Sequence, residues 1–321
     1  MHRIAVTMGD PAGIGGELVL RAFERPPSRT VPVIVGDLSV LEQVAGLLFE
    51  GRLIPIKPFG QGAAGDVEIL DVGAIESVRF GLSDGRCGGA SYRYIMEGLR
   101  LVLSGDVSAI VTCPINKKSV QASGMPFIGH TELLAHYGGV SDYVMMMAAR
   151  SFRVCLVTIH VPLKDVPSLI DQERVFRSIA LTARSLKVDF GIGAPRLKVC
   201  GLNPHAGEQG AIGTEDEAIR DAVMRAQEAG INVEGPFSAD SLFHRPDCDA
   251  YVAIYHDQGL LPVKTIAFAR CVNITLGLPF VRTSVGHGTG LDIAGTGVAD
   301  PTSLIEAYRV AEGMIKSRSR I

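Results

Sequence analysis

The sequence lacks several features that would assign it to a specialised class of protein. It carries no strong charge of either sign, since its formal net charge is −3, which argues against a nucleic-acid or anionic-membrane partner. No apolar run is long enough to cross a bilayer. Met1-His2-Arg3 leads directly into a strand-like segment without the layout of a signal peptide, so we expect a cytoplasmic protein.

The six cysteines lack the spacing that binds metals or forms disulfide frameworks. No pair is arranged as CxxC, and Cys113, Cys155 and Cys200 lie inside apolar, strand-like segments. This pattern is typical of reduced, buried thiols in a cytoplasmic protein and argues against cysteine metal ligands.

Apolar residues and glycine are abundant. The 321 residues are 47% hydrophobic and include 37 glycines and 17 prolines, so we expect an ordered globular chain with a large core, many tight turns and roughly two domains. No internal repeat, low-complexity tract or long linker marks the boundary between those domains.

Short β-branched segments alternate with longer amphipathic segments. The predicted strands are 3–8, 31–35, 108–113, 153–159, 197–202 and 250–255. The predicted helices include 17–23, 92–103, 171–187 and 215–229. Near-continuous apolar strands are typical of sheets covered on both faces, and their alternation with helices favours an α/β fold with a mainly parallel sheet.

Polar loops follow five of these strands, and ligands of open α/β sheets bind beyond the carboxyl ends of strands. His160, His205 and His256 each stand directly after, or within a few residues of, a strand end. One such histidine is more often structural, but three from adjacent strands could bind one divalent cation and leave a position open. Asp257 would then orient a ligand or face the substrate. This convergence requires that the strands are neighbours.

Glycine loops and a possible helix start supply further candidates. His130 and Thr131 begin a predicted helix, where they could cap it or contact a substrate. The loop "GDPAGIGGE" has Leu18 where the dinucleotide fingerprint needs its third glycine, and the loop 286–297 also fails that fingerprint. A nicotinamide cofactor would therefore not bind as in a standard Rossmann domain.

Seven motifs in order resemble the 4-hydroxythreonine-4-phosphate dehydrogenase family. They are TMGDPAGIG, TCPINK, GHTE, NPHAGE, GPFSAD, YHDQGLLPVK and VNITLGLPFVRTS. The two glycine loops also resemble signature loops of the isocitrate/isopropylmalate dehydrogenase superfamily. The resemblance implies two α/β/α domains with a mainly parallel sheet, formed by residues 1–118 plus 275–321 and by residues 119–274, with the active site in the cleft between them.

The resemblance also implies the residues that bind each ligand. A divalent metal (Zn, Mg or Co) shared across a homodimer interface is expected on His160, His205 and His256. The expected substrate-binding residues are His130, Thr131, Lys264, Asn273 and Arg282. NAD or NADP is expected at Gly286, His287, Gly288, Thr289 and Asp292.

The implied reaction is oxidation of a phosphorylated 3-hydroxy acid followed by loss of CO2, with 4-phosphooxy-L-threonine giving 3-amino-2-oxopropyl phosphate. Lys117 is the candidate for proton transfer, although it could equally be an exposed charge beside Lys118, and Asp257 is the second catalytic candidate.

The sequence departs from the family pattern at Gly16 and in the loop 284–290, where Gly286 replaces the usual Asp. The second departure leaves the choice of NAD or NADP and the subfamily open, and related dehydrogenases act on D-threonate or D-erythronate 4-phosphate or on a cyclic dihydrodiol carboxylate. A metal-dependent lyase or hydrolase without a cofactor and a non-catalytic binding protein are the rival classes. Neither explains both the histidines and the loop 286–297.

Overall fold

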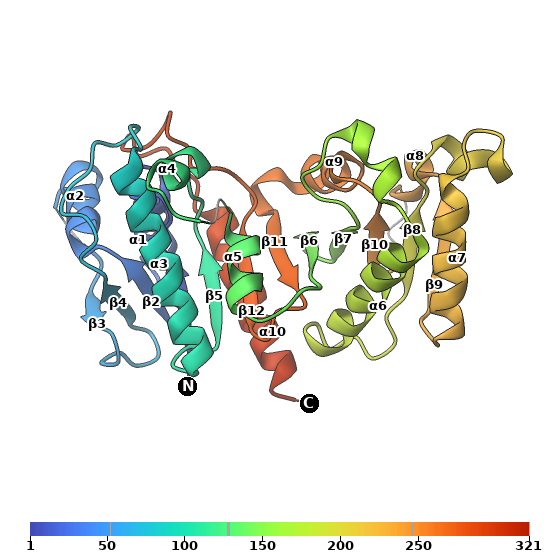
Figure 1. Ribbon diagram of the computed structural model, residues 1–321. Coiled ribbons are helices and arrows are strands. Elements are labelled where there is room, and N and C mark those ends of the chain that lie inside the picture. The colour runs from blue at the N-terminus through green and yellow to red at the C-terminus, as the bar shows by residue number, and fades with distance from the viewer. Residues whose placement is uncertain (52, 127–128, 245–246, 321) are drawn as a thin grey trace. The chain divides into compact units, whose positions relative to one another are not determined.

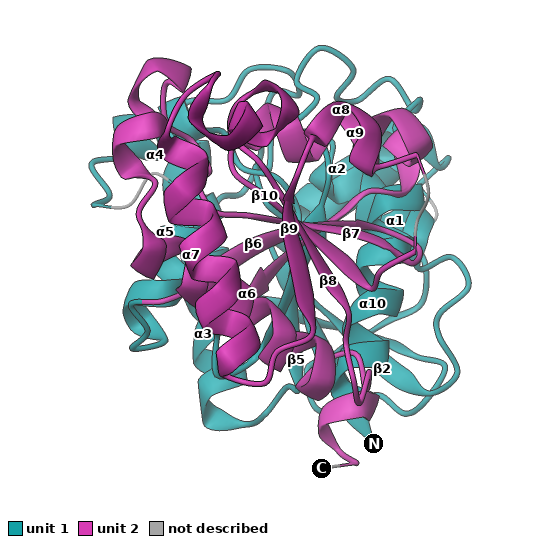
Figure 2. Cartoon of the chain, turned by 90° about the vertical axis from the view of Figure 1, so that its right-hand side faces the viewer, with its two compact units in different colours: residues 1–141, 278–315 teal, residues 142–277, 316–321 magenta. Residues whose placement is uncertain are grey.

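The computed structural model describes residues 1–51, 53–126, 129–244 and 247–320, and it divides into two compact units (Figures 1 and 2). Unit 1 comprises residues 1–141 and 278–315, and unit 2 comprises residues 142–277 and 316–321. Helix α5 (His130–Tyr137) groups with unit 1, whereas the sequence-based boundary places it in the second domain. The domain boundaries predicted from the family resemblance stay a prediction.

Unit 1 is built on parallel strands. Their spatial order is β3 (Ile56–Pro58), β4 (Val67–Asp71), β2 (Thr30–Gly36), β1 (His2–Thr7), β5 (Ala109–Thr112) and β12 (Val281–Val285). Its helices are α1 (Gly15–Ala22), α2 (Leu38–Leu48), α3 (Gly85–Ser104), α4 (Lys117–Ala122), α5 and most of α10 (Thr302–Arg318). The residues of β2, β5 and β12 are buried along their whole length, as expected for strands covered on both faces.

Unit 2 has one antiparallel strand among parallel ones. The spatial order is β11 (Val272–Leu276), β6 (Val144–Ala149), β7 (Phe152–Leu156), β10 (Ala250–Ala253), β8 (Leu197–Cys200) and β9 (Val233–Phe237). Strand β6 runs antiparallel to both β11 and β7, and the β7–β10, β10–β8 and β8–β9 pairs are parallel. The α-helices are α6 (Gln172–Val188), α7 (Glu215–Glu228), α8 (Ala239–Leu242) and α9 (His256–Ala267). Short 3-10 helices are η1 (Leu163–Asp165), η2 (Pro167–Leu169), η3 (Pro204–Gly210) and η4 (Phe268–Arg270).

The predicted α/β class is confirmed, and each predicted strand and helix has a counterpart within a few residues of its predicted bounds, except that α3 begins earlier. Strand β6, with the sequence VMMMAA, was not predicted. Methionine and alanine are not β-branched and carry little strand propensity. Strand β6 pairs with β11 on one side and β7 on the other, and the backbone hydrogen bonds of these two pairings stabilise it in place of strand propensity.

Side-chain caps determine where several helices begin. The Asn116 carboxamide accepts hydrogen bonds from the backbone N–H groups of Lys118 and Ser119 at 3.0 and 3.2 Å, which satisfies donors that the first turn of a helix leaves open. Lys117 is therefore the first residue of α4, and residues 113–116 connect it to the end of β5. Asp84 caps α3 in the same way through Arg86 and Cys87.

The cysteines are free thiols, as predicted: Cys248 is half-buried and the others are buried. Within the part of the chain that the structure describes, no helix combines the length and the apolar character needed to cross a bilayer.

Candidate active site

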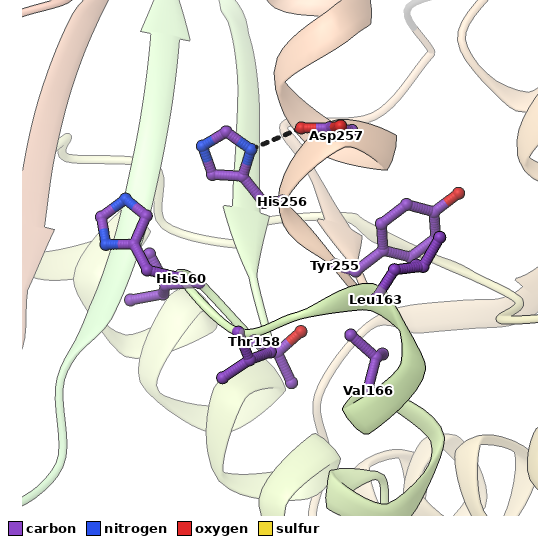
Figure 3. Close-up of a pocket in the computed structure, with 9 residues that line it drawn as sticks. Thr158, His160, Leu163, Val166, Tyr255, His256 and Asp257 are labelled. Carbon is purple, nitrogen blue, oxygen red and sulfur yellow. Dashed lines mark hydrogen bonds and ion pairs between the residues drawn. The ribbon is translucent and has the colours of Figure 1, made fainter.

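Two of the three predicted metal ligands lie at the carboxyl ends of neighbouring strands. His160 follows β7, and His256 begins α9 directly after β10; β7 and β10 are adjacent and parallel. The centres of the His160 and His256 rings are 5.6 Å apart, and Figure 3 shows one nitrogen of the His256 ring turned toward Asp257 and the other turned away from it. The two strands that carry these histidines are therefore neighbours, as the pairing of His160 with His256 requires.

The start of α9 is held in place by buried contacts. Gln258 accepts a hydrogen bond from the Ile254 N–H at 2.6 Å and donates one to the Gly201 carbonyl at 2.7 Å, so it links the ends of β10 and β8. A Cβ atom on Gly259 would lie 2.5 Å from the Leu156 side chain. Glycine therefore lets α9 approach β7 closely, which brings His256 over the strand ends.

The His256 ring is oriented by the neighbouring carboxylate. Its Nδ1 lies 2.6 Å from Asp257 Oδ1 (Figure 3). A carboxylate on one ring nitrogen sets the tautomer and makes the other nitrogen, Nε2, a better metal ligand. The pocket beside this pair has a mixed lining of apolar and polar side chains. It is lined by Thr158, Ile159, His160, Val161, Leu163, Val166, Tyr255, His256 and Asp257.

His205, the third predicted ligand, lies in η3 after β8. Its Nδ1 is 2.7 Å from Glu208 Oε1, and this hydrogen bond and the charge of Glu208 raise the pKa of the exposed His205 ring. The backbone has positive φ values at His205 and Ala206, an uncommon conformation for residues with a Cβ atom. No group of three or more His, Cys, Asp or Glu side chains among the described residues is arranged to hold a metal. His205 as the third ligand of the His160–His256 pair stays a prediction.

Unit 1 contains a second cluster, in which the half-buried His130 lies near the buried Arg282 and the exposed Lys117. Arg282, on β12, is 2% exposed, and its Nη2 donates a hydrogen bond to Thr112 Oγ1 at 2.9 Å. Burial lowers the pKa of Arg282 to about 10. Burial, followed by the charges of Arg282 and Lys117, holds the pKa of His130 well below its usual value, so this imidazole is neutral near pH 7.

The cluster has an unsatisfied polar atom. His130 Nε2 is buried, and no described residue forms a hydrogen bond with it. Buried polar atoms are nearly always paired with protein, water or ligand. Because the neighbouring charges are those of Arg282 and Lys117, an anion is the ligand that this position suits best. Thr131, the next residue of α5, is half-buried.

Lys264 and Asn273, the remaining predicted substrate residues, belong to unit 2. Lys264 lies on α9 with its Nζ 5.7 Å from the centre of the Phe268 ring. Asn273 lies on β11 opposite Met147 of β6. Its Oδ1 is buried and, within the described residues, has no hydrogen-bond partner.

The two glycine loops of the sequence contact each other within unit 1. The Ile14 N–H donates to the Thr289 carbonyl at 3.1 Å, and a Cβ atom on Gly13 would lie 2.8 Å from the same oxygen. Gly288 is exposed, and a Cβ atom there would meet nothing within 4 Å. The loop backbone at this point is open to a ligand.

Polar groups along the loop 286–297 fit a ligand with hydrogen-bonding capacity. Gly286 donates its N–H to Ser303 Oγ at 3.0 Å, and His287 Nδ1 lies 2.9 Å from the Gly288 carbonyl oxygen. His287 Nε2 is buried, and the residues that the structure describes offer it no partner. Asp292 is exposed.

The sequence analysis did not single out a network beneath the first glycine loop. Asp10 is 1% exposed; it accepts a hydrogen bond from the Ala12 N–H at 2.9 Å and another from the Ser83 hydroxyl. Ser83 Oγ is 2.6 Å from Ser119 Oγ. Burial raises the pKa of Asp10.

Ser83 also lines a pocket in unit 1, in addition to the pocket beside His160 and His256 in unit 2. The lining residues are Val78, Arg79, Gly81, Leu82, Ser83, Asp84, Arg86, Cys87 and Leu291. In the sequence, the only sign of this network is Asp10 in the "GDPAG" loop. A carboxylate between an apolar strand and glycines is expected to be buried, and a buried carboxylate needs hydrogen-bond donors.

The fold is that of the isocitrate dehydrogenase-like α/β enzymes. Isocitrate dehydrogenase from Methylococcus capsulatus superposes with a TM-score of 0.50 at 15% identity, covering 100% of this chain and 88% of that one. At this identity the likeness concerns the fold alone.

The sequence itself assigns the family. Residues 28–311 match the model of the family described as "Pyridoxal phosphate biosynthetic protein PdxA". A 4-hydroxythreonine-4-phosphate dehydrogenase from Sulfurihydrogenibium sp. is 41% identical, covering 97% of this chain and 98% of its relative. The chain belongs to the PdxA family, and it is an oxidoreductase of the dehydrogenase type.

Two further relatives of similar sequence identity carry different enzyme names. The structure of 4-hydroxythreonine-4-phosphate dehydrogenase from Klebsiella pneumoniae has a TM-score of 0.86 and 34% identity, covering 98% of this chain and 100% of that one. A D-threonate 4-phosphate dehydrogenase from Cupriavidus necator is 42% identical, with 95% of each chain covered.

Proposed function

We propose that this chain oxidises and decarboxylates a phosphorylated 3-hydroxy acid with NAD or NADP and a divalent metal. The substrate that the family supports best is 4-phosphooxy-L-threonine, which gives 3-amino-2-oxopropyl phosphate and CO2 in pyridoxal phosphate biosynthesis. The observation that carries the proposal is the cluster of His130, buried Arg282 and exposed Lys117, in which the buried Nε2 of His130 has no hydrogen-bond partner among the described residues.

The cluster suits one anionic end of such a substrate. An arginine guanidinium can donate two parallel hydrogen bonds to a phosphate, and these bonds are stronger away from water. Neutral His130 adds a donor or an acceptor according to its tautomer. Thr131, Lys264 and Asn273 are proposed to complete the substrate contacts. The unsatisfied Oδ1 of Asn273 is an acceptor for a hydroxyl or an ammonium group.

The histidines of unit 2 fit a divalent metal by their chemistry. His205 and His256 each have a carboxylate at Nδ1, which leaves Nε2 to ligate. Imidazole donors favour Zn or Co over Mg. We propose His160, His205 and His256 as the ligands of one metal in a cytoplasmic homodimer, with the metal site near the subunit interface. When bound, the metal would lower the pKa of the reacting hydroxyl and polarise the resulting carbonyl.

The other residues would bind, orient and move protons. Lys117, at the start of α4, is proposed to exchange the proton of the reacting centre through its Nζ, and Asp257 to hold His256 in its ligating orientation. Gly286, His287, Gly288, Thr289 and Asp292 are proposed to bind the adenosine half of the cofactor, since the glycines let the ligand approach the backbone.

D-Threonate 4-phosphate is the second candidate substrate, because the relative from Cupriavidus necator carries that name at 42% identity. D-Erythronate 4-phosphate and a cyclic dihydrodiol carboxylate complete the panel. The test is NAD(P)H formation with each phosphorylated acid, its unphosphorylated form and the dihydrodiol. We expect kcat/KM to be highest for 4-phosphooxy-L-threonine. A preference for D-threonate 4-phosphate would replace the substrate, and equal rates with and without phosphate would contradict the phosphate site.

A further inference from the structure

Helix α1 contacts the loop 286–297 and the residues directly after it at two places. At the N-terminal side of α1, the Ile14 N–H donates to the Thr289 carbonyl at 3.1 Å. One turn further on, Glu17 and Arg21 reach Gly297 and Ala299. A single short helix therefore holds the loop near both of its ends.

The second contact is made by an ion pair within the helix. Glu17 Oε1 accepts hydrogen bonds from Arg21 Nε at 3.0 Å and from the Ala299 N–H at 3.2 Å. Arg21 Nη2 donates to the Gly297 carbonyl at 2.6 Å. The two side chains thus bind the C=O of Gly297, the last residue of the loop, and the N–H of Ala299, two residues further along the chain.

The burial of Glu17 sets this pair apart from ordinary surface pairs. The Glu17 side chain is 2% exposed, whereas that of Arg21 is 31% exposed. Glu17 Oε2 is buried and finds no hydrogen-bond partner among the described residues. Exposed i,i+4 pairs contribute little to stability, and a buried carboxylate carries a desolvation cost. Apolar side chains, Leu18, Val19 and Leu20, already anchor α1 in the core.

We propose that Glu17 and Arg21 are positioning residues that fix the end of the loop 286–297 to α1 and so preorganise its backbone for the nicotinamide cofactor. The proposal rests on the cofactor assignment made above. A loop that is already ordered binds its ligand more tightly, because less conformational entropy is lost on binding. The pair does not touch the reacting atoms in this account, and its effect is expected on cofactor affinity.

The variant Arg21→Lys tests this role most cleanly. Lysine keeps a positive charge beside Glu17 but lacks the planar fork that donates to Glu17 and Gly297 together. We expect the Kd of NADH, followed by its own fluorescence, and the KM of the oxidised cofactor to rise about tenfold. The KM of the hydroxy acid is expected to stay close to that of the wild type. Hydrogen exchange of the backbone amides in residues 290–300 should accelerate without any cofactor present.

Two further variants keep the test decisive. Glu17→Gln preserves shape and an acceptor at position 17 and should show the same split between cofactor and substrate. Arg100→Lys is the control, since Arg100 forms a similar but exposed pair with Glu97 on α3 at 2.8 Å. It should change neither the exchange of residues 290–300 nor the Kd of NADH.

The outcomes separate this proposal from the function on which it rests. If wild-type protein binds neither NADH nor NADPH, the cofactor assignment itself is wrong, and the proposal falls with it. If wild type binds the cofactor but Arg21→Lys and Glu17→Gln match it in Kd, the positioning role alone is overturned. Faster exchange with an unchanged Kd would likewise overturn it, because the pair would then only stabilise the fold.

Discussion

His205 of unit 2 and His130 of unit 1 differ in burial, and their pKa values shift in opposite directions. His205 in unit 2 is exposed beside Glu208, which raises the pKa of its ring. His130 in unit 1 is half-buried near Arg282 and Lys117 with its Nε2 atom buried, and desolvation is the main reason that its pKa lies well below the usual value. The same side chain is therefore more basic in one unit and neutral in the other.

This difference teaches that a histidine's chemistry follows from its neighbours rather than from its motif. A ring with a carboxylate on Nδ1, as in His205 and His256, keeps its Nε2 available to ligate a cation. A neutral ring near cationic side chains, as His130 is near Arg282 and Lys117, suits an anion. The proposed metal site and the proposed phosphate site would thus use the same residue type for ligands of opposite charge.

The largest effect is expected from removing a metal ligand. His256→Ala should lower kcat by about a thousandfold or more, since metal stabilisation of the reacting oxygen is worth several kcal/mol. Metal bound per chain, measured by mass spectrometry, should fall with the rate, and far-UV circular dichroism should stay unchanged. His244→Ala, an exposed histidine of the same unit, is the control. A His256→Ala enzyme of normal rate and metal content would show that unit 2 holds no such site.

The next effect concerns the buried cation of unit 1. Arg282→Ala should raise the KM of the phosphorylated acid by about ten- to a hundredfold, because each charge-assisted contact is worth roughly 1.5–3 kcal/mol. Arg282→Lys should recover part of this loss, since a point charge lacks the fork geometry. Thermal melting of both variants identifies any loss of fold. A KM that stays constant in two folded variants would place the phosphate elsewhere.

The contrast between His130 and His205 also predicts opposite dependences of stability on pH. For His130 the folded pKa lies below the unfolded value of about 6.5. The unfolded chain therefore binds the proton first as pH falls below 6.5, and wild type should lose up to about 1.4 kcal/mol per pH unit relative to His130→Gln. Urea unfolding at pH 7.5, 6.5 and 5.5 measures this difference. Parallel curves for the two proteins would contradict a neutral His130.

For His205 the sign is reversed, because its folded pKa is raised. Its contribution to stability is present below the unfolded pKa and is lost as pH rises through the folded pKa. Relative to His205→Gln, wild type should therefore become less stable as pH rises above about 6.5. The same urea series measures this difference in unfolding free energy. If wild type instead became more stable than His205→Gln as pH rises, Glu208 would not be raising the pKa of His205.

The smallest effect is expected at the cofactor loop. Gly286→Asp adds a negative charge that should disfavour the extra phosphate of NADP, so the NAD to NADP ratio of kcat/KM should rise by a few-fold to about tenfold. Steady-state kinetics with both cofactors measures the ratio. A constant ratio would show that position 286 does not face the ribose.

Local patterns predicted strands β1, β2, β5, β7, β8 and β10, because these segments are apolar and end in polar loops, and they left β3, β4, β6, β9, β11 and β12 unpredicted. The pairing of His160 with His256 could be predicted only on the condition that their strands are neighbours, and the structure meets that condition for β7 and β10. The positive φ values around His205 could not be predicted, because non-glycine residues adopt them only where tertiary contacts impose them.

The buried contacts of Asp10 and Glu17 also could not be predicted from the sequence. Their partners, Ser83 and Ala299, lie far away along the chain. A carboxylate in an apolar setting indicates that buried donors exist, but it does not indicate which residues supply them.

The most direct test of the central claim is the stoichiometry of the reaction with metal-loaded protein, carboxyl-labelled 4-phosphooxy-L-threonine and the preferred cofactor. Oxidation followed by decarboxylation predicts one NAD(P)H and one labelled CO2 per substrate consumed, and neither product after dialysis against a chelator until Zn or Co is restored. Formation of NAD(P)H without CO2, or consumption of substrate without NAD(P)H, would contradict the account.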